Sequence, residues 1–282
     1  MAAPSAAIEK PGASWQPEKL PPFPAVAMKA LTLIAGADTS LLDLCNVVRS
    51  DTAFSAEILR IANSPLIAFP KAITSVLQAS MLLGFLRLKK VVLTLGLKAY
   101  LQEQFTPAVY LCWRHSIASA LIAEHAAKWT PFDADFAHTA AVMHDIGRIA
   151  LAASMPAAYG RVIETSVERP RDLLEVEREH CGIDHCQAGR SLVSTWGLPD
   201  TLVEVIGCHH DPETPWRGAA SLLPPSCILA DWLSFGVATY RSLGTYAEIL
   251  GGFPALAREH FPVASQDLAA QIGSEIRMIE SA

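Results

Sequence analysis

Histidine is the residue type whose placement says most about the chemistry of this sequence. Eight of the nine histidines lie within residues 115–210, and several stand beside one another or beside an aspartate. Imidazole and carboxylate groups are ligands for divalent metals that keep positions open for water or substrate. Together they could hold two metal ions. The candidate ligands are His115, His144, Asp145, His185, His209, His210 and Asp231.

The dipeptide His144-Asp145 is the centre of this set. It can give one metal an imidazole while its carboxylate bridges to a second metal. Gly147, two residues further on, has no side chain and lets another backbone or a ligand come close. If the chain stays helical, Arg148 lies on the same face as His144, four residues back. A guanidinium there suits phosphate oxygens, so Asp145 and Arg148 are the candidate catalytic residues.

The elements that must position these residues are helices. From Ala25 onward the apolar residues follow helical spacing, and no alternation of period two lasts more than a few residues. Prolines and polar residues separate the periodic segments. The sequence therefore predicts an all-α, multi-helical fold. The predicted helices are about 24–35, 40–50, 53–62, 73–83, 86–102, 108–128, 134–153, 157–168, 172–180, 185–196, 200–210, 220–238 and 265–280.

The chain divides by composition. Residues 1–19 are rich in Ala, Pro and Ser and are predicted to be a disordered lead-in. A histidine-free helical part at 20–105 precedes the histidine-rich part at 106–238. Residues 239–282 then form a C-terminal helical extension. We expect the first helical part to be structural or interactive and the chemistry to lie in the second.

Composition narrows the class of protein. The chain of 282 residues is 51% hydrophobic and 18% charged, enough for a large core, and its mean hydropathy of +0.28 suggests a homodimer. No apolar run is long enough for a membrane span, and the start lacks a secretory signal, so we expect a cytoplasmic protein. A net charge of −6 without a basic run argues against direct nucleic-acid binding. The six cysteines are expected to be free thiols.

The order of the candidate ligands resembles the H…HD…D pattern of the HD phosphohydrolase superfamily. The later histidines resemble the extra ligands of its two-metal HD-GYP branch. In that branch the first histidine and the HD pair bind metal, the aspartate of the pair bridges, and the later histidines complete the second site. The resemblance carries these roles to all seven candidate ligands and implies two divalent ions. Iron, manganese, zinc and nickel suit such ligands about equally.

Motifs spread over residues 20–238 are similar to those of the HDOD family. They read LPPFP at 20–24, SDTAF at 50–54, ILRIANS at 58–64, LLG at 82–84, GIDH at 182–185, TWGLP at 195–199 and CHH at 208–210. The resemblance implies an HD-domain-like helical bundle with an N-terminal helical subdomain. It also implies a role in bacterial signalling with protein partners, in a family whose members often lose metal ligands.

The chain departs from the pattern at three places. Arg148 stands where a lysine usually follows the HD pair, and it keeps the charge but does not donate a proton. The GYP segment is replaced by residues 211–216, so cyclic di-GMP does not follow as the substrate. Leu111 stands where three-metal relatives place a glutamate, which limits the site to two metals.

Two functions from different classes remain open. One is a signalling module, in which the helical core presents a surface to partners and the metal serves structure or sensing. The other is a metal-dependent phosphohydrolase, a phosphodiesterase acting on a nucleotide or cyclic nucleotide. The complete ligand set favours the enzyme. The missing GYP segment favours the signalling module. We prefer the signalling module, and we expect metal to be bound whichever function holds.

Several residues also have plainer interpretations. A structural zinc could bind at His180-Cys181 with His185-Cys186, although this spacing is not that of known zinc modules. The other three histidines, His125, His138 and His260, are expected at the surface. Asn63 is predicted to end the third helix in a left-handed conformation.

Overall fold

The structure is a computed structural model that describes residues 15, 25–35, 40–64, 67, 69–101, 106–168, 172–237 and 244–280. All regular structure in these residues is helical, which confirms the predicted all-α fold. The elements are α1 (Ala25–Ala35), α2 (Leu41–Arg49), α3 (Thr52–Ala62), α4 (Val76–Leu101), α5 (Pro107–Ala127), α6 (Ala134–Met143), α7 (Ile146–Ser154), α8 (Pro156–Glu168), α9 (Leu173–Cys181), α10 (His185–Thr195), α11 (Asp200–Cys208), η3 (Gly218–Leu222), α12 (Leu223–Ala230), η4 (Asp231–Phe235), α13 (Tyr246–Leu250), α14 (Ala255–Arg258) and α15 (Ser265–Glu280).

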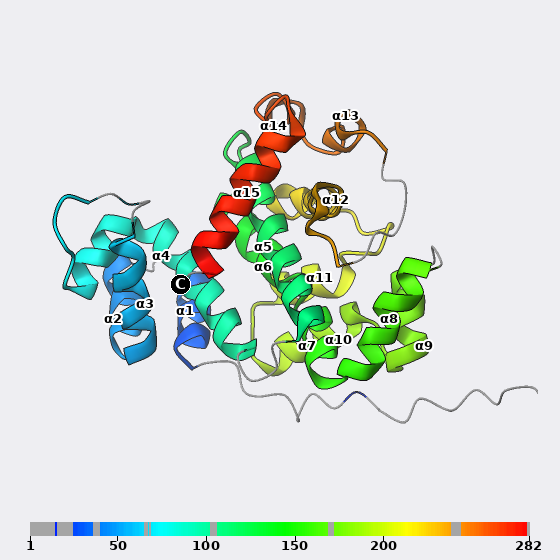
Figure 1. Cartoon of the computed structure of the whole chain (residues 1–282), viewed down its shortest axis with the longest axis horizontal. Helices are drawn as coiled ribbons and strands as arrows, with labels where there is room; N and C mark the ends of the chain where they lie inside the picture. Colours follow the sequence, from blue (N-terminus) through cyan, green and yellow to red (C-terminus); the bar gives the residue numbers. More distant parts are fainter. Residues whose placement is uncertain are drawn as a thin grey trace, which may run out of the picture.

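Helices α1, α2 and α3 pack against α4 and form a group at one end of the molecule (Figure 1). The side chain of Ser40 accepts a hydrogen bond from the backbone of Asp43 and begins α2, and Asp51 caps α3 in the same way. At the end of α3, Asn63 has φ −93°, so the predicted left-handed conformation is wrong. Its side-chain amide instead donates to the carbonyl of Ile73 at 2.8 Å and ties the helix end to the next segment.

The predicted helices at 73–83 and 86–102 are two halves of α4. The chain leaves helical geometry at Gly84, where φ is +75° and ψ is 166°. Glycine adopts this conformation without the strain that a side chain would bring. The predicted start at residue 73 is wrong, because the helix begins at Val76. Of the predicted lead-in, Trp15 is described and packs partly buried against the core.

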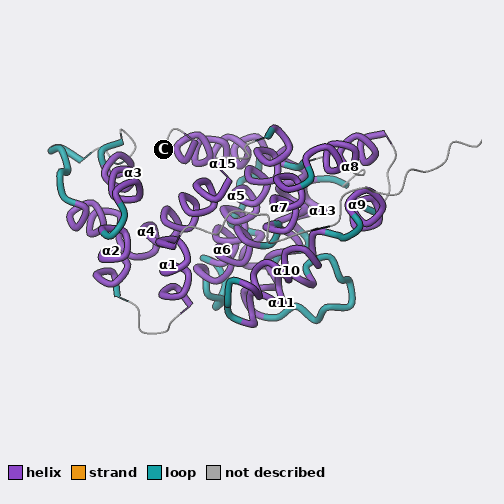
Figure 2. The backbone as a smooth tube through the Cα atoms, turned by 90° about the horizontal axis from the view of Figure 1, so that it is seen from below, coloured by secondary structure: helices purple, strands orange, loops and turns teal. Residues whose placement is uncertain are grey.

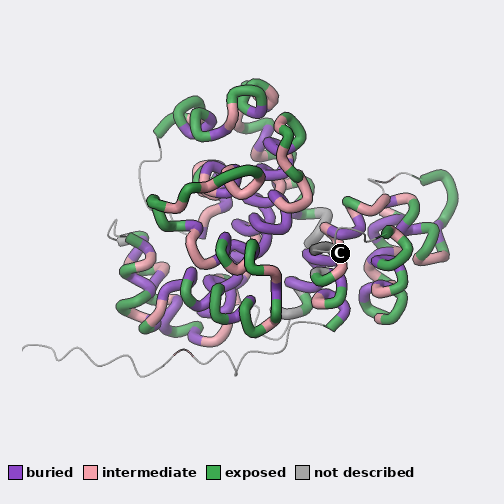
Figure 3. The backbone as a smooth tube through the Cα atoms, turned by 180° about the vertical axis from the view of Figure 1, so that it is seen from behind, coloured by how far each residue is buried: buried purple, intermediate pink, exposed green. Residues whose placement is uncertain are grey.

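Helix α5 runs through the middle of the larger group of helices and contacts α6, α7, α12 and α15 (Figures 1 and 2). Small residues along it, such as Ala118 and Ala120, are fully buried and allow neighbouring helices to approach closely. Buried backbone therefore concentrates around α5, while the outer turns are exposed (Figure 3). His115 sits on this helix with no exposed surface.

The predicted helix 134–153 is wrong as a single element, because the chain turns at His144-Asp145 between α6 and α7. Asp145 has φ −95° and ψ 16°, outside helical geometry. A Cβ on Gly147 would overlap the backbone of His185 and Gly189, so α7 and α10 cross with their backbones in contact. This crossing brings the start of α10 beside the turn that carries the HD pair.

The predicted helix 220–238 is also wrong as a single element. The chain passes from the 3-10 turn η3 into α12 and then into the π-helical turn η4, where Ser234 has φ +68°. Helices α13 and α14 were not predicted, whereas α15 has the predicted bounds 265–280. None of the helices in the described ranges is long and apolar enough to cross a membrane.

Candidate metal centre

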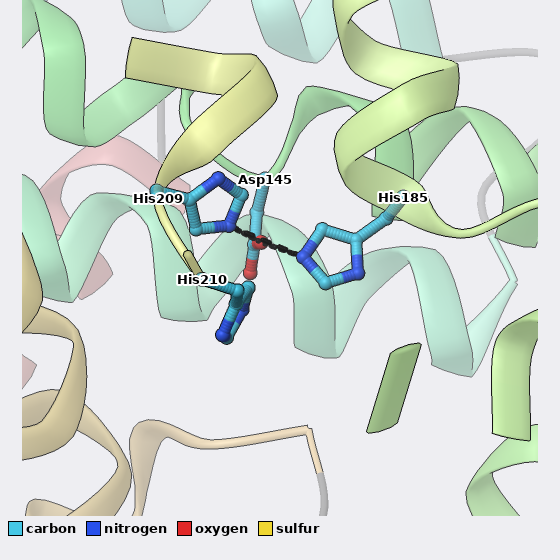
Figure 4. Close-up of side chains that lie close together, drawn as sticks. All are labelled: Asp145, His185, His209 and His210. Atoms are coloured by element: carbon cyan, nitrogen blue, oxygen red, sulfur yellow. Dashed lines mark hydrogen bonds and ion pairs between the residues drawn. The ribbon is translucent and has the colours of Figure 1, made fainter. Parts of the chain in front are cut away.

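Asp145 lies in the turn between α6 and α7, close to the start of α10 and the end of α11. Its Oδ1 is 3.4 Å from Nε2 of His185, at the start of α10, and 3.4 Å from Nε2 of His209, at the end of α11. The imidazole of His210 packs 4.5 Å from that of His209, measured between ring centroids. Figure 4 shows these side chains pointing toward one another. Asp145, His185, His209 and His210, here called the His210 cluster, each offer a ligand atom within 4.8 Å of the others.

The second carboxylate oxygen of Asp145 faces a different set of ligand atoms. Its Oδ2 is 3.5 Å from Nε2 of His144 and 3.7 Å from Nε2 of His115. The same Nε2 of His115 lies 3.3 Å from Sγ of Cys227 on α12. His115, His144 and Cys227, here called the Cys227 cluster, also have ligand atoms within 4.8 Å of one another. The carboxylate of Asp145 therefore stands between two clusters, with one oxygen toward each.

The hydrogen bonds of the imidazoles leave lone pairs directed at these clusters. In His185, Nδ1–H donates to Glu177 at 2.6 Å, and in His209, Nδ1–H donates to the carbonyl of Ile206 at 2.9 Å. In the neutral form each ring then carries its lone pair on Nε2. The two Nε2 atoms are only 3.1 Å apart. Two lone pairs at that distance repel each other, and a divalent metal bound by both nitrogens would relieve the repulsion, so the donor set fits such a metal.

The same geometry holds at His144. Its Nδ1–H donates to the carbonyl of Ala141 at 2.6 Å, and its Nε2 is buried without a hydrogen-bond partner. Asp145 Oδ1 is also buried without one. Buried polar atoms are nearly always satisfied, and metal coordination would satisfy both of these.

The protonation states favour metal binding at two of the histidines. Burial lowers the pKa of His144 to about 3. His210 is an exposed residue, but desolvation of its ring, together with the neighbouring His209 and His185, holds its pKa well below the usual value. Both are therefore neutral at neutral pH, which is the ligand form of imidazole. Burial opposes ionisation of Asp145, but Arg148 and His144 outweigh it and hold the pKa of that carboxyl well below its usual range.

Glu177 on α9 supports the site and was missed by the sequence analysis. It is fully buried, and its Oε2 accepts hydrogen bonds from the backbone N–H of His185 at 2.8 Å and from Nδ1–H of the same residue. Tyr159 donates its hydroxyl to the other oxygen at 3.1 Å. A carboxylate on the far nitrogen of a ligand histidine fixes its tautomer and orientation. Nothing in the spacing of Glu177 from the histidines marks it as part of the site.

Asp231 lies next to His115 but on the other side of its ring. Its Oδ1 is 3.2 Å from Nδ1 of His115, the nitrogen that faces away from Cys227 and Asp145. The structure thus brings six of the seven predicted ligands into the two clusters and places Asp231 behind one of them. Cys227, which the sequence analysis did not consider, lies one helical turn before Asp231. That spacing of four residues was the available signal.

Arg148 is buried and turned toward the HD pair. Its Nη1 donates to Oδ2 of Asp145 at 3.0 Å. The condition for its predicted place on the face of His144, a continuous helix, is not met, and the guanidinium is directed at the carboxylate of Asp145 instead.

A cavity of about 320 Å³ opens beside both clusters. It includes His210 and Cys227 in its wall, so a molecule in the cavity could reach either cluster. Trp216, Pro212 and Ile228 supply apolar surface, and Asp211 is the acidic residue in the lining. A small molecule with an apolar portion fits such a wall.

The alternative zinc site is not assembled. His180 Nε2 lies 3.2 Å from the hydroxyl of Thr165, and among the described residues the ligand-type side chains gather only in the two clusters above. The expectation that His125, His138 and His260 lie at the surface is wrong for His138, which is buried beside Glu124. His125 is half-buried and contacts the carbonyl of His260 at 3.0 Å.

The HDOD domain family matches residues 20–212 of this sequence. The chain belongs to the HDOD family. The match includes the N-terminal helices and every residue of the His210 cluster, whereas Cys227 and Asp231 lie beyond it.

Two curated relatives match part of this HDOD chain. An uncharacterized protein of Treponema pallidum (strain Nichols) is 23% identical over 203 residues, covering 70% of the chain and 39% of the relative. Ribonuclease Y of Thermus thermophilus is 31% identical over 168 residues, covering 59% of the chain and 24% of the relative. The chain therefore spans less than half the length of these relatives.

Solved structures share the fold. An HDOD domain protein of unknown function from Geobacter sulfurreducens superposes with a TM-score of 0.72 at 20% identity, covering 94% of this chain and 92% of the other. A candidate signal transduction protein from Marinobacter aquaeolei VT8 gives 0.74 at 22%, covering 93% and 60%. A candidate phosphohydrolase from Shewanella amazonensis SB2B gives 0.64 at 23%, covering 93% of both chains. At these identities the likeness shows the fold alone.

Proposed function

We propose that this HDOD chain carries a dinuclear metal centre that hydrolyses a small phosphodiester in bacterial signalling. The observation that carries the proposal is the position of Asp145, whose Oδ1 faces the His210 cluster and whose Oδ2 faces the Cys227 cluster. A carboxylate between two sets of imidazoles could hold two metal ions close together, as two-metal hydrolysis needs.

Each residue has a definite task in this proposal. Two bound divalent ions would supply an activated water and neutralise charge on the phosphoryl oxygens. Asp145, kept ionised by Arg148, holds the two halves of the site together. Glu177 keeps Nε2 of His185 facing Asp145. The apolar cavity wall around Trp216 contacts the organic part of the substrate and limits the access of bulk water.

The surface properties favour a small substrate over a polynucleotide. Ribonuclease Y is named for action on RNA, but this chain has a net charge of −6. The described lining of the cavity includes neither lysine nor arginine. Binding a long nucleic acid requires several cations along its backbone. A nucleotide or cyclic nucleotide needs far fewer cations, because it carries far fewer phosphates.

A signalling module without catalysis is the second candidate, and one observation favours it. Arg148, the cation that could meet a phosphate, is buried and donates to Asp145. The metals would then hold the fold or report a signal to protein partners. The Marinobacter structure, a candidate signal transduction protein, shares the fold.

Hydrolysis of bis(p-nitrophenyl) phosphate by the metal-loaded chain distinguishes the phosphodiesterase from the signalling module. If the chain is an enzyme, turnover should be lost in Asp145→Asn, because that carboxylate faces both clusters. The control His180→Ala removes a histidine outside both clusters and should leave the rate unchanged. A wild-type chain that holds two metals but turns over neither this ester nor a panel of cyclic nucleotides would leave the signalling module as the function.

A further inference from the structure

Cys227 occupies the position at which a fourth ligand is expected. Its sulfur lies 3.3 Å from Nε2 of His115, the nitrogen that also faces Asp145 Oδ2 at 3.7 Å. The Nε2 of His144, buried and without a hydrogen-bond partner, belongs to the same cluster. Two imidazoles and a thiol therefore lie together, and a carboxylate oxygen of Asp145 approaches both imidazoles.

The separations agree with a tetrahedral metal. Zinc binds nitrogen at about 2.0–2.1 Å and sulfur at about 2.3 Å, so neighbouring ligand atoms in a tetrahedron are about 3.3–3.6 Å apart. The observed separations in this cluster are 3.3 Å for His115–Cys227, 3.5 Å for His144–Asp145 and 3.7 Å for His115–Asp145. These three separations are close to those of a tetrahedral site, and the ligand atoms of His144 and Cys227 also lie within 4.8 Å of each other.

Asp231, the ligand that the family resemblance implied, is placed for a different task. It contacts Nδ1 of His115, and an ion held by Nε2 of that ring lies on the opposite side. A carboxylate on Nδ1 fixes the tautomer that leaves the Nε2 lone pair free. A Cβ on Gly236 would lie 2.6 Å from Oδ1 of Asp231, so the close approach of this glycine also helps hold the carboxylate in place.

We propose that Cys227, rather than Asp231, is the fourth ligand of the metal bound by His115, His144 and Asp145, and that this half of the centre selects zinc. The proposal rests on the dinuclear centre proposed above. A thiolate is a soft ligand that favours zinc over manganese or magnesium. Asp231 is then a positioning residue.

The two halves of the centre consequently differ. Two nitrogens, one oxygen and one sulfur close the coordination shell around the first ion, as in structural zinc sites. The second ion, at the His210 cluster, has only nitrogen and oxygen ligands and borders the cavity. Cys227 also lines the cavity, but its ion would have no open coordination position, so substrate should bind the second ion and the first ion should exchange slowly.

Cobalt(II) in place of the native metal tests this directly, because a cobalt–thiolate bond gives an intense charge-transfer band in the near ultraviolet. The full chain is stripped with chelator and reloaded with cobalt, and bound metal is counted alongside the spectrum. We expect the wild-type band to disappear in Cys227→Ser. Cys227→Asp, which restores an oxygen ligand, should bind two ions without the band.

Two cysteine variants and one aspartate variant serve as controls. Cys186 is the other thiol near the centre, 3.7 Å from Nδ1 of His209, and Cys208 contacts Arg190. Cys186→Ser and Cys208→Ser should both keep the band. Asp231→Asn should also keep it, with metal affinity weakened about 10- to 100-fold.

The outcomes separate this inference from the proposed function. Two bound cobalt ions with no thiolate band, or a band lost in Cys186→Ser but kept in Cys227→Ser, would overturn the role of Cys227 and leave the dinuclear centre standing. A chain that binds no cobalt would overturn both the role of Cys227 and the proposed dinuclear centre. Circular dichroism of each variant verifies that the fold is retained.

Discussion

At the scale of single residues, the centre depends on how each ligand is held. His144, His185 and His209 all donate their Nδ1–H to a neighbouring acceptor, which leaves Nε2 for the metal. Two of these acceptors are backbone carbonyls, and the third is the buried carboxylate of Glu177. The tautomers are thus set by the fold before a metal arrives, and the ligand geometry is preorganised.

Replacing Glu177 by glutamine tests this support. The amide can still accept from the backbone of His185, but it lacks the charge that strengthens the bond to Nδ1–H. We expect metal affinity at the His210 cluster to fall about 10- to 100-fold while the fold survives. Competition with a calibrated chelator measures the loss. Glu175→Gln, an exposed glutamate on the same helix, is the matched control, and an equal effect in both variants would contradict the role of Glu177.

Sequence patterns identified the ligand residues more completely than their roles. The histidine spacing and the HD pair led to six residues that the structure brings into the two clusters. Glu177 was missed because its role depends on how α9 packs, which no local pattern encodes, and Cys227 was missed although it stands four residues before Asp231. Asp231 was predicted as a metal ligand; the structure places it at the start of the π-helical turn η4, beside Nδ1 of His115.

At the scale of elements, the turn between α6 and α7 and the crossing of α7 with α10 bring the ligands together. Periodicity predicted most helices within one or two residues, because their apolar faces and caps are local features. It failed at 134–153 and 220–238, where the apolar pattern continues through the breaks at Asp145 and η4. The break at Asp145 stops the helix at the residue that faces both clusters.

Gly147→Ala tests the helix crossing. The new methyl group would meet the backbone of His185 and Gly189, neither of which can move without separating α7 from α10. We expect a loss of about 1–3 kcal/mol of unfolding free energy, together with weaker metal binding at the His210 cluster. Urea denaturation and metal titration measure the two effects.

Gly160→Ala is the control for that variant. Gly160 lies within α8 with no atom within 4 Å of the added Cβ. There the substitution should stabilise the chain by up to about 1 kcal/mol, since alanine favours helix. If Gly147→Ala behaves like this control, the close crossing does not set the site.

At the scale of the whole molecule, a buried ionic network joins the N-terminal group of helices to the rest. Lys90 on α4 lies 2.5 Å from Glu124 on α5, and His138 on α6 lies 3.3 Å from the same carboxylate. Lys89 on α4 reaches Asp135 on α6 at 3.0 Å. These contacts hold the two groups together and were not predicted, because the partners are far apart in the sequence.

The network should make stability depend on pH. Burial tends to raise the pKa of Glu124, but His138 and Lys90 outweigh it and hold the pKa well below its usual range. A carboxyl with a lowered folded pKa stabilises the fold above its unfolded pKa and loses that contribution as pH falls through the folded value. Glu124→Gln should therefore cost about 1–3 kcal/mol at neutral pH.

Urea denaturation over a pH series measures this, and the difference between wild type and Glu124→Gln should shrink below about pH 4.5. Glu57→Gln, which removes a more exposed ion pair with Arg60, should change stability by less than about 1 kcal/mol throughout. A cost for Glu124→Gln that stays constant down to strong acid would contradict this assignment.

The most direct test of the central claim is the metal content of the freshly purified full chain, measured by plasma mass spectrometry beside the His144→Ala/Asp145→Ala double variant. Asp145 faces both clusters, so its loss should empty both halves. We expect two metal ions per wild-type chain and none in the folded variant. A wild-type chain that is free of metal, and that stays so after incubation with zinc, iron or manganese, would contradict it.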